Sequence, residues 1–145
     1  MRKIIILLLL TTTVTYSQIL EPVKWSTEIK KISNTEYDLI IHATIDEGYH
    51  LYSQKVPDDG PLPTIFIFEK NENYELIGIT TEGKGHVVYD PVFELNIRYF
   101  DTKATFKQRI KVTNKKQFKI NVEIEFMTCN DTNCITGYDD VEFNI

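Results

Sequence analysis

Two cysteines are the residues in this chain whose type and spacing favour chemistry. Cys129 and Cys134 are the only cysteines in the 145 residues, and four residues separate them. A close pair of this kind is a reversible dithiol, a structural disulfide or part of a metal site. The function of the chain depends on which of these three it is, and the rest of the sequence reads as a scaffold for the pair.

The strand pattern before the pair predicts where the first cysteine points. An inward stripe of apolar side chains occupies even positions, namely Phe118, Ile120, Val122, Ile124 and Phe126. Successive side chains of a strand face opposite sides, so the odd-numbered Cys129 is predicted to leave the core face. Closing so short a loop contributes only roughly 2 kcal/mol, which favours reversible exchange. The alternative stays open that the chain is a non-enzymatic β-sandwich interaction module in which the hairpin disulfide is only structural.

Other chemistries have weaker support. The three histidines (His42, His50 and His86) and the two cysteines lack the spacing of a zinc motif, so we expect no metal and no cofactor. There is no nucleophile elbow and no phosphate-binding glycine loop. The net charge of −5 argues against a general nucleic-acid binder. A weaker third hypothesis is ligand binding by the aromatic loops that hold Tyr49, Tyr52 and Tyr89.

The remaining pattern predicts short strands and no helix. The expected strands cover 23–32, 37–45, 64–68, 74–80, 93–99, 104–112, 118–126 and 141–145, with a hairpin or flexible segment at 81–91. The stretch 64–68 is continuously apolar and is expected to be buried, and Trp25 is expected to anchor the core. About eight or nine regularly spaced strands predict an all-β, immunoglobulin-like antiparallel β-sandwich, with a barrel as the alternative.

The first residues have the pattern of a signal peptide. Arg2 and Lys3 precede a short apolar run at 4–10, and 15–17 is the expected cleavage end. Residues 1–17 are therefore predicted to be removed, leaving one domain at 18–145. No second long apolar run follows, so we expect no membrane insertion after cleavage. The mature protein is expected to be a periplasmic or secreted monomer in an oxidising compartment.

Four segments occur in an order that resembles a known family. They are Gly48-Tyr-His-Leu-Tyr-Ser-Gln54, Gly60-Pro-Leu-Pro-Thr64, Tyr89-Asp-Pro-Val-Phe93 and Cys129-Asn-Asp-Thr-Asn-Cys134. Together they make residues 22–145 resemble the N-terminal periplasmic domain of the DsbD thiol:disulfide interchange protein. The resemblance implies an immunoglobulin-like sandwich whose cysteine pair relays reducing equivalents. Its expected partners are thioredoxin-like thiol proteins, exported or membrane-tethered, and other exported proteins are the recipients.

The resemblance also implies roles for individual residues. By position, Cys134 corresponds to the cysteine that forms mixed disulfides, and Cys129 to the one that resolves them. A cap loop within 83–93 is expected to cover the pair, with His86 or Tyr89 as the covering side chain. The full set expected to shield the cysteines is His50, Tyr52, His86, Tyr89 and Phe93.

Two features depart from the family pattern. Family members commonly carry a proline pair soon after the second cysteine, whereas this chain has Ile135-Thr136-Gly137. The sequence also holds neither a membrane domain nor a thioredoxin-like domain. We therefore expect either that separate proteins supply its electrons or that the domain has another role.

Overall fold

The computed structural model describes residues 20–114 and 116–145, so the predicted signal peptide lies outside the described residues. The described residues form strands and no helix, and thus no helix that is long and apolar enough to cross a membrane. The strands are β1 (Val23–Lys31), β2 (Glu36–Ile45), β3 (His50–Tyr52), β4 (Ile65–Phe68), β5 (Tyr74–Glu82), β6 (His86–Asp90), β7 (Leu95–Phe100), β8 (Lys103–Val112), β9 (Lys119–Cys129) and β10 (Cys134–Asn144).

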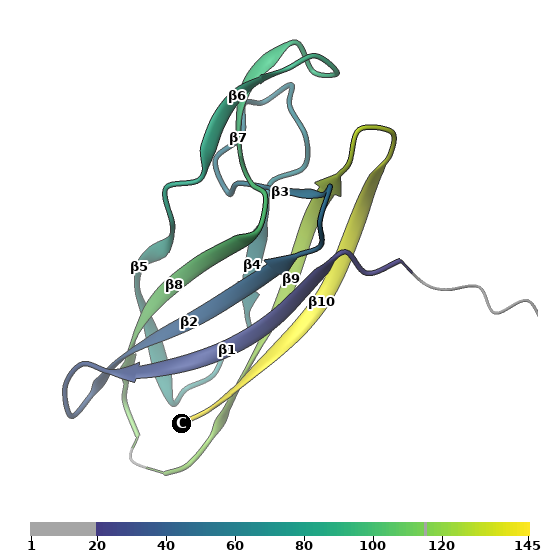
Figure 1. Ribbon diagram of the computed structural model, residues 1–145. Helices are drawn as coiled ribbons and strands as arrows, with labels where there is room; N and C mark the ends of the chain where they lie inside the picture. Colours follow the sequence, from purple (N-terminus) through teal and green to yellow (C-terminus); the bar gives the residue numbers. More distant parts are fainter. Residues whose placement is uncertain (1–19, 115) are drawn as a thin grey trace, which may run out of the picture.

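The strands form two antiparallel sheets (Figure 1). One sheet has the order β1-β2-β8-β5, and the other has the order β10-β9-β3-β7-β6. The short strand β4 also pairs with β9, beyond the end of β3. Two packed sheets confirm the predicted immunoglobulin-like sandwich in place of the barrel.

The core lies between the two sheets, where apolar residues alternate with polar ones along each strand. In β9 the even positions from Ile120 to Phe126 are buried, as the sequence pattern predicts. They face side chains of β2 and β8 such as Ile41 and Phe106. Trp25 packs among the core aromatic rings, with its ring centroid 5.3 Å from that of Phe126.

Two strand predictions are wrong. The segment 64–68 is not buried throughout, because one face of β4 is open to solvent and exposes Ile65 and Ile67. The final strand begins at Cys134 rather than near residue 141. Its first half lacks an apolar alternation because β10 pairs only with β9 and leaves much of its surface in solvent.

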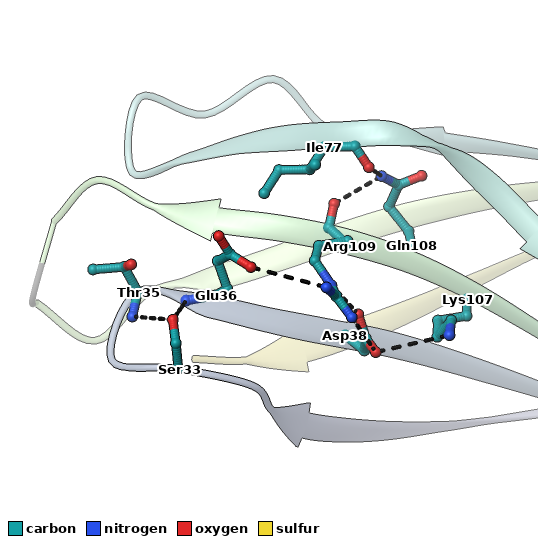
Figure 2. Close-up of polar contacts among 8 residues, drawn as sticks. All are labelled: Ser33, Thr35, Glu36, Asp38, Ile77, Lys107, Gln108 and Arg109. Carbon is teal, nitrogen blue, oxygen red and sulfur yellow. Dashed lines mark hydrogen bonds and ion pairs between the residues drawn. The ribbon is translucent and has the colours of Figure 1, made fainter.

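A bulge in β5 is held by a buried glutamine from β8 (Figure 2). The β5–β8 register shifts between Ile77 and Thr81. Gln108 donates from Nε2 to the Ile77 carbonyl at 3.1 Å. Its Oε1 also accepts from the Thr80 hydroxyl at 3.0 Å. The amide therefore satisfies backbone and side-chain groups that the ladder leaves unpaired.

An ion pair on the outer face of the same sheet links β2 to β8 (Figure 2). Asp38 is only 3% exposed, and its two oxygens accept from Arg109 Nε at 2.6 Å and Nη2 at 3.1 Å. Lys107 Nζ lies 3.9 Å from the same carboxylate. The hydrogen bond from Arg109 holds the pKa of Asp38 below its usual value.

This ion pair gives a prediction for stability. We expect Asp38→Ala to lower the free energy of unfolding at neutral pH by about 2 kcal/mol, because two charge-assisted hydrogen bonds are lost. The folded-state pKa of Asp38 is depressed, so its contribution exists above the ordinary value of 3.8 and disappears as the pH falls through the folded-state pKa. Urea unfolding followed by Trp25 fluorescence, at neutral and strongly acidic pH, measures both effects.

Glu36→Ala is the matched control. Glu36 approaches the same Arg109 only to 3.9 Å and is partly exposed, so its loss is expected to cost under about 0.5 kcal/mol. Equal costs for the two substitutions at neutral pH would show that the buried pair contributes nothing specific.

Candidate functional site

The cysteines close the hairpin between β9 and β10. Cys129 and Cys134 are directly opposite each other in the strand register, and a disulfide of 2.01 Å joins their sulfur atoms. Beyond them, the Asn130 amide donates to the Asn133 carbonyl at 2.9 Å and completes a tight turn. The disulfide is therefore a cross-strand link at the very end of a hairpin that eleven opposed residue pairs already hold together.

The side chain of Asn130 organises the turn between the cysteines. Its Oδ1 accepts hydrogen bonds from the Thr132 amide at 2.9 Å, the Thr132 hydroxyl at 3.0 Å and the Asn133 amide at 2.8 Å. An asparagine that bonds to the backbone two and three residues onward is a typical turn-forming device. The turn between the two cysteines is thus fixed by the side-chain amide of Asn130.

The two cysteines differ in their access to solvent. Cys129 is only 2% exposed, whereas Cys134 is an exposed residue at the start of an edge strand. The alternation of side chains along β9 predicts that Cys129 leaves the core face, and Cys129 is indeed not a member of the main core cluster. Cys129 is nevertheless buried, because a second apolar cluster covers it.

The second cluster is built by β3, β7 and the β6–β7 hairpin around the Cys129 side chain. Its buried members are Tyr52, Ile97 and Cys129. Val56, Phe93, Leu95, Tyr99 and Met127 pack against them. The β6–β7 hairpin and the β9–β10 turn lie at the same end of the molecule, with β3 beside them (Figure 1).

A chain of polar contacts runs from this cluster to the tip of the β6–β7 hairpin. His50 Nε2 lies 3.1 Å from the Tyr52 hydroxyl, which donates to Asp90 Oδ2 at 3.2 Å. The other oxygen of Asp90 accepts from the amides of Val92 at 2.8 Å and Phe93 at 3.3 Å. Asp90 therefore fixes the turn of the hairpin and connects it to β3.

Burial and charge act in opposite directions on His50. Burial lowers the pKa of the imidazole below its ordinary value, while the carboxylates of Asp90 and Asp131 act to raise it. For Tyr52, burial and the Asp90 carboxylate both raise the pKa, so the phenol stays protonated as a hydrogen-bond donor. The described residues contain no cluster of side chains that is suited to hold a metal ion.

The residues expected to shield the cysteines do not all lie in the cluster around Cys129. His50 and Tyr52 lie on β3, and Phe93 packs against the Cys129 cluster with its ring centroid 6.2 Å from that of Tyr52. Tyr89 is 61% exposed and is not a member of that cluster. His86 is exposed at the side of the hairpin, 3.6 Å from Asp101, with its ring 6.2 Å from that of Tyr99.

The β6–β7 hairpin, which carries His86, Tyr89 and Phe93, is joined to β5 by a short segment that contains Gly83 and Gly85. Gly85 has a φ of +58°, and a Cβ there would approach the Tyr99 carbonyl to 2.9 Å, so only glycine fits without strain. At the end of β5, Glu82 accepts from the Ser53 hydroxyl at 2.5 Å and from the Gln54 amide at 2.8 Å. The base of the hairpin and the loop after β3 are thereby tied together.

Sequence reasoning missed two residues of this site. Asp90 precedes a proline, which predicts a turn, but its hydrogen bond to Tyr52 has no counterpart in the sequence pattern. Tyr99 belongs to a predicted alternating strand, and its place 4.7 Å from the His50 ring depends on the β3–β7 pairing. Neither contact has a signal in local sequence.

The fold and the site together define a class, namely an immunoglobulin-like domain with one cross-strand disulfide at a hairpin end. The family model for the N-terminal part of the thiol:disulfide interchange protein DsbD matches residues 17–144. The chain therefore belongs to the DsbD N-terminal domain family. A search of curated proteins found no match.

Solved structures with a similar fold have little sequence identity to this chain. The reduced DsbD N-terminal domain of Neisseria meningitidis is 15% identical over 83% of each chain, with a TM-score of 0.51. The N-terminal periplasmic domain of ScsB from Proteus mirabilis is 12% identical with a TM-score of 0.59, over 85% of this chain and 46% of that one. The GAE domain of yeast GGA1 is 8% identical over 89% and 96%, with a TM-score of 0.51. At such identities these similarities establish the fold alone.

Proposed function

We propose that this domain exchanges its Cys129–Cys134 disulfide with exported thiol proteins and relays reducing equivalents between them. The observation that carries the proposal is the unequal exposure of the two cysteines, with Cys134 open to solvent and Cys129 2% exposed. Exchange needs one sulfur that a partner can approach and a second that is protected from other reactants. Membership of the DsbD N-terminal family supports the same reaction.

The proposed reaction begins at Cys134. A partner thiolate attacks Cys134 Sγ, the disulfide breaks, and Cys129 leaves as a thiolate that takes up a proton. A second partner thiolate then attacks the partner's own sulfur and releases Cys134, so the partner becomes a disulfide and the domain gains two electrons. The reverse sequence passes these electrons to an oxidised target protein.

The proposed partners are thioredoxin-like thiol proteins outside the cytosol. Such a partner presents one exposed cysteine to Cys134 and a second one nearby to complete the transfer. A periplasmic or secreted location fits a disulfide-bearing domain, and the similar ScsB domain is described as periplasmic. The β6–β7 hairpin, through Phe93, covers the Cys129 side of the pair in the absence of a partner.

The reduction potential of the pair tests this proposal. We expect a value above about −270 mV, among proteins that exchange disulfides in their function. Equilibration with glutathione or dithiothreitol, followed by alkylation and mass spectrometry, gives the value. A value below about −300 mV, together with a clear loss of stability on reduction, would identify a structural disulfide and contradict the proposal.

A further inference from the structure

His50 lies beside the buried cysteine of the pair. The two residues are directly opposite each other on the neighbouring antiparallel strands β3 and β9. Residues in that relation point to the same face of the sheet, with Cβ atoms roughly 5 Å apart. The Thr128 hydroxyl donates to the His50 carbonyl at 2.9 Å and secures this pairing. The imidazole is therefore within reach of the Cys129 sulfur.

The hydrogen-bond chain determines which nitrogen of His50 holds the proton. The Tyr52 hydroxyl has one hydrogen and donates it to Asp90. Its oxygen must then accept from His50, so the proton of the neutral imidazole is on Nε2. Nδ1 is left with a free lone pair, which makes it a proton acceptor. Asp90 is held in turn by two backbone amides, so the whole chain is fixed.

We propose that His50 accepts the proton of Cys129 when this cysteine resolves a mixed disulfide, and returns it when Cys129 leaves as a thiolate. This inference rests on the proposed exchange function and adds a catalytic residue to it. A buried thiolate without a nearby proton carrier is costly, because Cys129 is screened from water. An imidazole on the same face supplies that carrier.

The proton and electron balance is complete for a domain that reduces a target. The Cys134 thiolate attacks the target disulfide, which gives a Cys134–target mixed disulfide and one target thiolate. Cys129 then gives its proton to His50 Nδ1, and its sulfur attacks Cys134 Sγ. The Cys129–Cys134 bond forms, the second target sulfur leaves as a thiolate, and the proton passes to it or to solvent. Two electrons have moved from the domain to the target.

The groups around His50 suit a base that works near neutral pH. Tyr52, on the same strand, is neutral, and Tyr99 packs from β7 with its ring 4.7 Å away. The charged groups facing it are Asp90 from β6 and Asp131 from the cysteine turn, which stabilise the imidazolium. Burial acts in the other direction and lowers the pKa of His50 from its ordinary 6.5, so the ring is neutral and able to accept a proton at pH 7 and above.

The attack by Cys134 and the closure by Cys129 can be measured separately when the reduced domain reacts with 5,5′-dithiobis(2-nitrobenzoate). The first thionitrobenzoate released reports the attack by Cys134, and the second reports closure by Cys129. We expect His50→Gln to slow the second release by about 100-fold at neutral pH and to leave the first unchanged. In the native protein the second rate should also fall as the pH drops through the His50 pKa, and this inflection should vanish in the variant.

Two further variants make the result decisive. His42→Gln alters a histidine on the outer face of the other sheet and is expected to leave both releases unchanged. Tyr52→Phe keeps His50 but removes its link to Asp90, so a smaller slowing of the second release is expected even if His50→Gln proves unstable. A second release that is as fast in His50→Gln and Tyr52→Phe as in the native protein would overturn the role of His50. A reduction potential of the native Cys129–Cys134 pair below about −300 mV would instead overturn the exchange function itself.

Discussion

Replacing Cys134 with serine is expected to abolish mixed-disulfide formation with a thioredoxin-like partner, and Cys129→Ser is expected to accumulate it. The reason is the difference in exposure, since a partner sulfur reaches Cys134 but not the 2% exposed Cys129. In Cys129→Ser the captured partner stays attached because no neighbouring thiol releases it. The partner lacks its own resolving cysteine, and its remaining thiol is first converted to a mixed disulfide with thionitrobenzoate, so the Cys134 thiolate attacks the partner sulfur and thionitrobenzoate leaves. Non-reducing electrophoresis and mass spectrometry measure the adduct.

The two variants are matched, because each removes one sulfur and the same disulfide. Their folds should survive equally, since the bond closes a short loop and the β9–β10 register holds the hairpin without it. Thermal unfolding of both variants provides this control. Capture of the partner by Cys134→Ser, with none by Cys129→Ser, would reverse the assigned roles and make the buried cysteine the attacking one.

Adding a side chain at Gly137 is expected to lower stability strongly. Gly137 pairs with Phe126 across β9 and β10, and a Cβ there would lie 2.2 Å from the Phe126 Cζ atom. The ring must move, and with it the contact to Trp25 in the core. We expect Gly137→Ala to lower the free energy of unfolding by about 3 kcal/mol, at the upper end of overpacking costs.

The neighbouring Thr136→Ala is the control, because that side chain is exposed on the same strand and its loss should change stability little. Phe126→Leu in the Gly137→Ala background should recover part of the loss, since a smaller side chain makes room for the new methyl group. Denaturant unfolding of the native protein, Gly137→Ala, Phe126→Leu and the double variant gives the coupling energy between the two positions. Equal stabilities for Gly137→Ala and Thr136→Ala would show that the close packing of ring on glycine is unimportant.

The sequence predicts the sandwich well wherever one face of a strand is buried and the other is wet. The even-numbered stripe of β9 and the alternation in β2 and β8 are examples. Prediction failed where this contrast is absent. β4 is apolar on both faces although one of them is open, and the first half of β10 contains Thr136, Gly137 and Tyr138 without an inward stripe.

The site shows the same division between local and long-range information. Parity along β9 correctly removes Cys129 from the main core, because it depends only on strand geometry. Its burial in a second cluster depends on β3, β7 and a hairpin that are distant in sequence. Tyr52 and Asp90 are 38 residues apart in the sequence, and no periodic pattern of side chains predicts their contact.

The placement of both cysteines in one hairpin has a consequence for the oxidation of the newly made chain. With two cysteines there is a single intramolecular pairing, so oxidation has no incorrect isomer to correct. The thiols also lie five residues apart, so they meet as soon as this hairpin forms and do not wait for distant strands to assemble. Oxidation of a newly made chain therefore gives the native disulfide without reshuffling.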